Sequence, residues 1–315
     1  MKIVLITPAG ARSRLGNRAT ANRWAGFLRE AGHRVAVQTC WDRRTADLMI
    51  ALHARKSHAS ISEFAMAFPE RALVVVLTGT DLYRDIRTDE KARQSLRLAT
   101  RLIVLQDQGG RELTPALRDK TRIIYQSTRP ITAPKPLQRS FEICVSGHLR
   151  EEKDPFRAAL ALRYLTDESR ILVTHIGGAL SASFADEAKQ FMRSEPRYRW
   201  LGELPHWAAR RILARARVLV ISSRMEGGAN VVTEALTARV PVIASRIPGN
   251  IGMLGSHYAG YFPLEDARAL ATLLERVEFD AGFYRLLQKQ GSARRSLVTP
   301  ARERAALKRL IAEFG

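Results

Sequence analysis

The sequence predicts an α/β protein with two parallel sheets, one in each half of the chain. Three observations support this fold class. Short apolar runs typical of buried strands alternate with helical patterns along the 315 residues. A proline-bearing stretch at residues 127–140 interrupts the alternation, and a second alternating series begins at Phe141. Such alternation favours parallel strands joined by helices, with the carboxyl ends of the strands along one edge of each sheet.

The first half contains six expected strands. They are Lys2–Thr7, Arg34–Thr39, Leu48–Leu52, Ala72–Leu77, Arg101–Gln106 and Arg122–Gln126. A helix is expected between the first two, because Ala21, Trp24, Ala25 and Leu28 repeat at the spacing of one helical face. Gly32 is placed to end that helix.

The second half contains six further expected strands. They are Phe141–Gly147, Ile171–His175, Tyr198–Leu201, Val218–Ile221, Val240–Ala244 and a short one at Tyr261–Phe262. From Asp266 onward the pattern is helical. We therefore expect domains at residues 1–130 and 131–299, followed by a final helix within residues 300–315.

Composition narrows the classes of function. The net charge of +20, from 51 Lys and Arg against 31 Asp and Glu, attracts polyanions or phosphorylated small molecules. The basic residues are spread along the chain without a nucleic-acid recognition motif, so we expect no nucleic-acid partner. No apolar run reaches the ~18–20 residues that span a bilayer, so no stable membrane insertion is expected. The N-terminus is typical of a first strand rather than a signal peptide. Cys40 and Cys144 lack metal-ligand spacing and suit a reducing cytoplasm, which is the expected location.

The most informative segment is residues 222–235. Glu226 and Glu234 stand eight positions apart, Gly227 and Gly228 follow the first glutamate, and the expected strand Val218–Ile221 precedes them. A strand, a glycine loop and a helix in this order direct backbone N–H groups and the positive end of the helix at an anion. The two carboxylates can then accept hydrogen bonds from hydroxyls on either side of that anion. A phosphate between two polyols is a nucleotide sugar.

This spacing resembles the E-x7-E signature of retaining glycosyltransferases of the GT-B fold, in the large GT4-type family that includes glycogen and sucrose synthases. The resemblance implies two Rossmann-like domains whose parallel sheets face each other across a cleft. It also implies that the last helix returns to the N-terminal domain. Glu226 would bind hydroxyls of the donor sugar, and Glu234 the ribose of the nucleotide. Further residues expected at the nucleotide sugar are Gly227, Gly228, Ala229, Asn230, His148 and Gly16.

The loop after the strand at Phe141 supplies candidate cations. Family members carry an Arg shortly after Gly147 and a Lys five residues later, both bound to the donor diphosphate, and Lys153 occupies the Lys position. His148 stands where the Arg is expected, and Arg150 follows two residues later. Whether Arg150 or His148 replaces the guanidinium stays open. Two cations on the leaving diphosphate perform the work of a metal ion, so we expect no metal and no cofactor.

Strand ends in the first half supply the acceptor candidates. His53 follows the third expected strand, and the resembled enzymes often place a His near the reacting sugar, so it joins Glu226, Lys153 and Arg150 as a candidate catalytic residue. An anionic acceptor would meet basic side chains and one carboxylate at these loops. The acceptor-site candidates are Arg12, Arg18, Arg55, Lys56 and Asp81.

Four segments resemble one branch of the family over essentially the whole chain. They are residues 16–24, 52–57, 78–83 and 147–157. The branch is the selenosugar synthases of bacterial selenoneine biosynthesis. The resemblance implies a donor such as UDP-N-acetylglucosamine or UDP-glucose, selenophosphate as acceptor, a new selenium–carbon bond, and coupling to a selenoneine synthase.

Two other hypotheses remain at this stage. The first is a GT-B transferase acting on a lipid or saccharide at the membrane face, for which the net charge would be a membrane footprint. The second is a nucleotide-sugar binding protein without catalysis, which the His148 substitution motivates. Selenium is a strong nucleophile and needs no general base, so the selenosugar hypothesis predicts modest losses for His53→Ala and Asp81→Ala.

Overall fold

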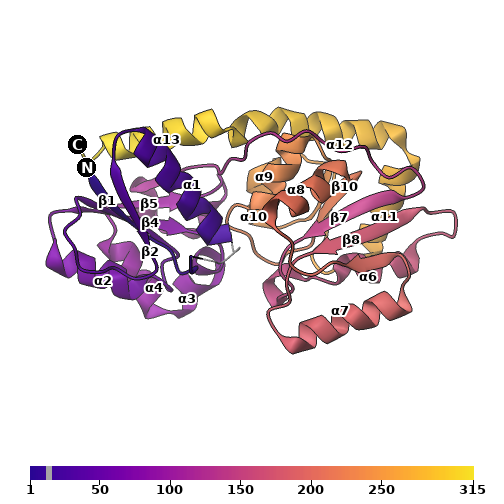
Figure 1. Cartoon of the computed structure of the whole chain (residues 1–315), viewed down its shortest axis with the longest axis horizontal. Helices are drawn as coiled ribbons and strands as arrows, with labels where there is room; N and C mark the ends of the chain where they lie inside the picture. The colour runs from indigo at the N-terminus through magenta and orange to yellow at the C-terminus, as the bar shows by residue number, and fades with distance from the viewer. Residues whose placement is uncertain (12–15) are drawn as a thin grey trace. The chain divides into compact units, whose positions relative to one another are not determined.

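The computed structural model describes residues 1–11 and 16–315, which form two compact units (Figure 1). The first unit comprises Met1–Gln126, the three residues Glu226–Gly228, and Pro300–Gly315. The second comprises Ser127–Met225 and Ala229–Thr299. The last helix therefore belongs to the first unit, although it follows the second along the chain.

Each unit is built on a six-stranded sheet in which every strand pair is parallel. The strand order is β2-β1-β3-β4-β5-β6 in the first sheet and β12-β11-β10-β7-β8-β9 in the second. In both orders the chain reverses direction beside its first strand, which is the doubly wound topology. The α/β fold class predicted from the sequence is confirmed.

The strands of the first sheet are β1 (Lys2–Ile6), β2 (Arg34–Gln38), β3 (Leu48–Leu52), β4 (Ala72–Leu77), β5 (Arg101–Val104) and β6 (Thr121–Ile123). The helices of the first unit are α1 (Gly16–Glu30), α2 (His58–Ala67), the π-helix η1 (Asp81–Asp85), α3 (Ile86–Thr88), α4 (Glu90–Leu98), η2 (Gly109–Glu112), α5 (Pro115–Asp119) and α13 (Pro300–Ala312).

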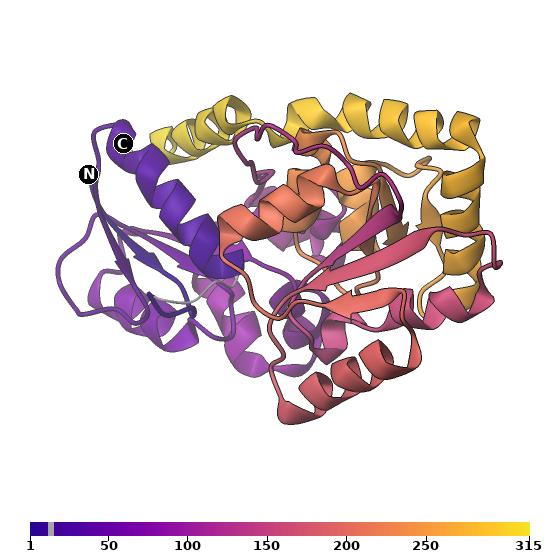
Figure 2. The same cartoon turned by 45° about the vertical axis from the view of Figure 1, so that its right-hand side comes forward.

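The first unit has a core on each face of its sheet, because side chains alternate along a strand. Ile3 and Leu5 of β1 lie in the core covered by α1 and α13, and Val4 and Ile6 lie in the core covered by α2 and α4. Figure 2 shows α1 and α13 together beside this sheet. Both faces are buried, which explains the continuous apolar runs of β3 and β4.

The strands of the second sheet are β7 (Phe141–Ser146), β8 (Ile171–Ile176), β9 (Tyr198–Trp200), β10 (Val218–Ile221), β11 (Val242–Ser245) and β12 (Tyr261–Phe262). The helices of the second unit are η3 (Glu151–Lys153), α6 (Arg157–Ala161), η4 (Leu162–Tyr164), α7 (Ala182–Ser194), α8 (His206–Arg215), α9 (Asn230–Ala238), α10 (Pro248–Leu254), α11 (Ala267–Phe279), α12 (Ala281–Arg294) and η5 (Arg295–Val298). Helix α8 packs on α9, and α6 packs on α11.

The strand expected at Val240–Ala244 begins two residues later than predicted. Arg239 ends α9 in the left-handed conformation (φ 62°), and the Val240 N–H bonds the Ala235 carbonyl. The Val240 backbone therefore belongs to the C-terminal end of α9 and not to strand β11, although its apolar side chain is buried. The stretch from 124 to 140 contains neither helix nor strand.

Helix α13 is fixed to α1 by one buried carboxylate. Glu303 Oε1 accepts hydrogen bonds from Trp24 Nε1 at 2.7 Å and from Arg23 Nη2 at 3.1 Å, and its Oε2 accepts one from Arg23 Nε at 2.8 Å. Both Glu303 and Trp24 are buried. Apolar side chains of α13 join the core beside them, namely Leu307, Leu310 and Ile311.

Candidate functional site

Hydrogen bonds join the loop after β10 to the loop after β7. These strands are neighbours in the second sheet, so their carboxyl ends lie side by side. Ser222 donates from Oγ to the Asp154 carbonyl at 2.8 Å, and Arg224 donates its backbone N–H to the Glu152 carbonyl at 2.9 Å. The loop that leads to Glu226 is thus held against the loop that carries Lys153.

The Arg224 side chain strengthens this attachment. Its guanidinium pairs with Glu265 at 2.6 Å and with Glu151 at 3.2 Å. All three side chains are at least one-third exposed, so each pair contributes little by itself. Together they connect Arg224 to the segments that carry Glu151 and Glu265. Sequence analysis missed Arg224, because its partners lie 41 and 73 residues away.

Steric contacts explain the two glycines that follow Glu226. Within the first unit, a Cβ at Gly227 would lie 2.3 Å from the Thr78 carbonyl oxygen, and a Cβ at Gly228 would lie 2.5 Å from Leu105 Cβ. Real Cβ atoms do not approach so closely, so any other residue would displace the backbone. Glu226 itself is 7% exposed. The loop is therefore packed in place rather than solvated.

Helix α9 presents the second glutamate. It starts at Asn230 after a buried Ala229, and Glu234 lies just beyond its first turn. The Glu234 side chain is 14% exposed, and its Oε1 bonds His206 Nε2 at 2.7 Å. The Ala229 side chain does not cap the N-terminus of α9, where the positive end of the helix dipole lies, as an anion requires. The nucleotide-sugar roles of Glu226, Glu234, Ala229 and Asn230 stay predictions.

The loop after β7 brings Lys153 back over the strand end. The aliphatic part of Lys153 passes within 3.8 Å of where a Cβ of Gly147 would be, and Arg150 lies 3.9 Å from Glu152. Burial lowers the pKa of His148, and the field of Glu203 only partly offsets this. His148 is therefore neutral near pH 7. Of the two candidates for the missing cation, the charge favours Arg150.

A buried histidine supports the same loop from the neighbouring strand. His175 of β8 lies with Nε2 3.3 Å from the Gly147 carbonyl and Nδ1 2.8 Å from the Tyr198 hydroxyl. A carbonyl can only accept, so Nε2 carries the proton and Nδ1 accepts from the phenol. Burial raises the pKa of Tyr198 and lowers that of His175 to about 4. His175 is thus a neutral brace beneath Gly147.

This brace predicts an acid-sensitive second unit. The pKa of His175 is 6.5 in the unfolded chain and about 4 in the folded protein. Between these pH values His175 binds a proton in the unfolded chain but not in the folded protein. Its contribution to stability is therefore complete above pH 6.5 and declines as the pH falls toward 4. Between pH 7.5 and 5.0 we expect the wild type to lose about 2 kcal/mol more unfolding free energy than His175→Gln. Urea unfolding at both pH values measures this. The exposed His257→Gln is the control, and equal losses in wild type and His175→Gln would contradict the assignment.

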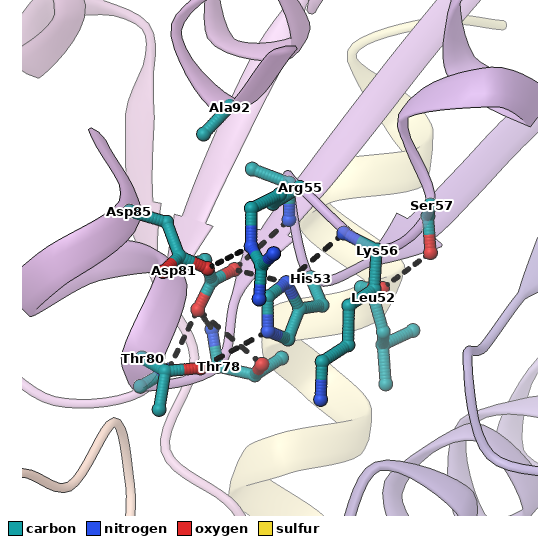
Figure 3. Close-up of polar contacts among 12 residues, drawn as sticks. Leu52, His53, Arg55, Lys56, Ser57, Thr78, Thr80, Asp81, Asp85 and Ala92 are labelled. Carbon is teal, nitrogen blue, oxygen red and sulfur yellow. Dashed lines mark hydrogen bonds and ion pairs between the residues drawn. The ribbon is translucent and has the colours of Figure 1, made fainter. Parts of the chain in front are cut away.

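In the first unit, His53 stands at the end of β3 in a strained conformation (Figure 3). Its φ of 75° lies in the left-handed region, which costs a non-glycine residue about 1–3 kcal/mol. The Lys56 backbone N–H donates to Nδ1 at 3.3 Å, so the neutral ring carries its proton on Nε2, which lies 3.0 Å from Thr80 Oγ1. Burial lowers the pKa of His53 despite the opposing field of Asp81. His53 therefore serves as a hydrogen-bond donor to Thr80.

Backbone N–H groups from two loops occupy both carboxylate oxygens of Asp81. One oxygen accepts the N–H groups of Thr78 and Gly79, both at 2.8 Å, and the other accepts the Ala54 N–H at 2.9 Å. The residue is 0% exposed. These bonds fix the loops after β3 and β4 to each other. The structure gives Asp81 a positioning role, and direct contact with an acceptor stays a prediction.

The basic acceptor candidates differ in their partners. Arg55 Nε bonds Asp85 at 2.7 Å. Burial alone would raise the pKa of Asp85, but its hydrogen bonds with Arg55 and Arg84 outweigh burial and lower that pKa. Figure 3 shows the Lys56 ammonium extending away from this pair, and it has no partner among the described residues. Lys56 is thus the more available cation.

The remaining candidates lie near the start of α1. Gly16 begins that helix and is exposed. Arg18 lies in its first turn and has a buried Nε without a hydrogen-bond partner in the described part of the chain. Arg12 lies outside the described residues. No group of three or more His, Cys, Asp or Glu among residues 1–11 and 16–315 is placed to hold a metal. None of the helices described is long and apolar enough to cross a bilayer.

The chain has two doubly wound parallel sheets, and in the second sheet strand β10 leads into a glycine loop and a helix. This is the architecture of the GT-B class of glycosyltransferases. Residues 131–294 match the family model "Glycosyl transferases group 1", which covers more than half of the chain. The chain belongs to that family.

Individual proteins are similar over most of their length. Glycosyltransferase 1 domain-containing protein 1 of Xenopus tropicalis is 25% identical over 284 residues, 81% of each chain. The crystal structure of Anabaena Alr3699/HepE in complex with UDP and glucose has a TM-score of 0.79 at 15% identity, covering 99% of this chain and 100% of that one. Sucrose-phosphate synthase from Thermosynechococcus elongatus has a TM-score of 0.79 at 17% identity, covering 99% and 98%. At these identities the two structures establish the shared fold.

Proposed function

We propose that this glycosyltransferase takes its sugar from a UDP-sugar bound at the loop after β10. The observation that carries the proposal is the start of α9, with Glu234 just beyond its first turn and eight positions after Glu226 in the sequence. In the same unit, Ser222 and Arg224 are hydrogen-bonded to the loop that holds Lys153 and Arg150. A nucleotide sugar is a sugar joined to a nucleoside through a diphosphate. The helix end and the two cations suit its diphosphate, and the two carboxylates suit the hydroxyls of its sugar and ribose. The structures of Anabaena Alr3699/HepE with UDP and with UDP-glucose support the choice of uridine.

In this proposal each group has one task. Glu226 accepts hydrogen bonds from sugar hydroxyls, and Glu234 from the ribose. Lys153 and Arg150 stabilise the negative charge that develops on UDP as it leaves, so the transfer requires no metal ion and no cofactor. The glycine loop brings backbone N–H groups close to the sugar or the diphosphate.

We further propose selenophosphate as the acceptor, with UDP-N-acetylglucosamine or UDP-glucose as donor. Selenium attacks the anomeric carbon, the bond from that carbon to the UDP oxygen breaks, and UDP leaves with the electron pair. Water then cleaves the selenium–phosphorus bond and releases phosphate, leaving a 1-seleno sugar for a selenoneine synthase. The four segments that resemble selenosugar synthases motivate this choice, and the exposed Lys56 near His53 suits a small anion.

The assignment needs no general base in the first unit. His53 cannot accept a proton at Nε2, because that nitrogen already carries one, and Nδ1 is engaged by the Lys56 N–H. A nucleophile as strong as selenium attacks without such help.

The test is UDP release from each donor with and without selenophosphate, with mass spectrometry of the products. We expect release that depends on selenophosphate and a product with the isotope pattern of selenium. Release without a selenium product would keep the donor site and reject this acceptor, and lipid or saccharide acceptors would be tried next. Nucleotide binding without turnover on any acceptor would favour a non-catalytic binding protein.

The charge difference at the β7 loop gives a second prediction. Arg150→Ala should raise the KM for UDP-sugar about tenfold, since it removes a charge-assisted bond to the diphosphate. His148→Ala should change it less than threefold, because His148 is neutral near pH 7. Initial rates of UDP release at varied donor concentration measure both. The reverse order would show that His148, not Arg150, replaces the family's arginine.

A further inference from the structure

We infer that His206, at the start of α8, is a positioning residue of the donor site that holds the Glu234 carboxylate for the ribose. This inference rests on the proposed function, since it concerns how the same site recognises its nucleotide. Nothing in the sequence pattern connects the two residues, which lie 28 positions apart. The contact arises because α8 packs on α9 within the second unit.

The bond is short and well placed. His206 Nε2 lies 2.7 Å from Glu234 Oε1, and no other hydrogen bond or ion pair reaches this carboxylate within the described residues. A carboxylate has no proton to give, so Nε2 is the donor and the bond is charge-assisted. The terminal torsion of a glutamate is otherwise broad. His206 is therefore the side chain that selects one orientation of the Glu234 oxygens.

The carboxylate keeps enough capacity for a ligand. Its two oxygens accept about four hydrogen bonds, and His206 uses one. Oε2 and the second lone pair of Oε1 remain for the two neighbouring hydroxyls of a ribose. The two side chains differ in their exposure to solvent. Glu234 is 14% exposed, whereas His206 is 67% exposed.

A histidine that orients a ligand-binding carboxylate acts before the ligand arrives. Its loss should weaken binding of the ribose hydroxyls and leave the diphosphate and sugar contacts intact. A histidine that merely occupies the carboxylate would have the opposite effect, because its removal would free an oxygen and tighten binding. Affinity for nucleotides with and without ribose hydroxyls separates these cases.

The experiment is calorimetric titration of UDP and of 2′,3′-dideoxyuridine diphosphate into four forms of the full chain. These are the wild type, His206→Ala, His206→Gln and the control His257→Ala, which removes an exposed histidine elsewhere in the second unit. We expect His206→Ala to weaken UDP about five- to tenfold and the dideoxy compound less than twofold. His206→Gln keeps a nitrogen donor near the position of Nε2 and should recover most of the affinity. His257→Ala should match the wild type.

Three results would overturn the inference. They are tighter UDP binding by His206→Ala, equal loss for both nucleotides, and no loss for either. If the wild type bound no UDP, the donor site itself would be rejected, which is a separate failure. Melting temperatures without nucleotide confirm that each variant is folded.

Discussion

Replacing Glu226 with Ala should nearly abolish sugar transfer, lowering kcat/KM by about 10²–10⁴-fold. A buried carboxylate that accepts two sugar hydroxyls contributes about 1.5–3 kcal/mol for each bond, and the sugar is the part that changes in the transition state. Glu226 is 7% exposed, so no solvent molecule easily takes over its role. Glu226→Gln keeps the size and one acceptor oxygen and should recover part of the loss.

The measurement is UDP release under initial-rate conditions, with Glu168→Gln as the control. Glu168 is an exposed glutamate of the second unit remote in sequence from both loops. Affinity for UDP without the sugar should change little in Glu226→Ala, because the proposed contact is to the sugar. Activity within threefold of the wild type would remove Glu226 from the site. Under the selenophosphate proposal, His53→Ala and Asp81→Ala should retain much more activity than Glu226→Ala.

Glu303→Ala should destabilise the first unit by about 3 kcal/mol, the largest stability effect that we expect of a single charged residue. The change leaves the Trp24 indole N–H and the Arg23 guanidinium without their buried partner. Removing one member of a buried ion pair typically costs about 3–5 kcal/mol, and Arg23 is partly exposed, which places the value at the lower end. Glu303→Gln keeps an acceptor for Trp24 and should be intermediate.

Urea unfolding followed by tryptophan fluorescence measures this effect. Glu30→Ala is a matched control, since Glu30 pairs with Arg304 across the same two helices but both side chains are 51% exposed. We expect less than about 0.5 kcal/mol for it. If both variants unfolded at the same urea concentration, the buried carboxylate would not be the anchor of α13.

The sequence predicted the sheets well where a strand is a continuous buried run. Leu48–Leu52, Ala72–Leu77 and Val218–Ile221 were predicted to the residue. These strands are covered on both faces, so apolar composition alone marks their ends. It predicted Val240 wrongly, because a buried apolar residue serves equally well at a helix end.

The site was less predictable from sequence, because its supporting contacts join distant residues. The spacing of Glu226 and Glu234 is local and was found, whereas His206, Arg224 and His175 act through partners that no local pattern reveals. Asp81 was identified by its place at a strand end, but only the structure shows that backbone N–H groups occupy both its oxygens. The charge state that separates Arg150 from His148 likewise depends on burial.

The central claim is that the loop after β10 and the start of α9 form a nucleotide-sugar site. Equilibrium binding of UDP to wild type, Lys153→Ala and Glu234→Gln tests it most directly, because it requires no knowledge of the acceptor. We predict saturable one-to-one binding by the wild type, weakened at least about tenfold by each substitution. No binding of UDP, or binding that both substitutions leave unchanged, would contradict the account.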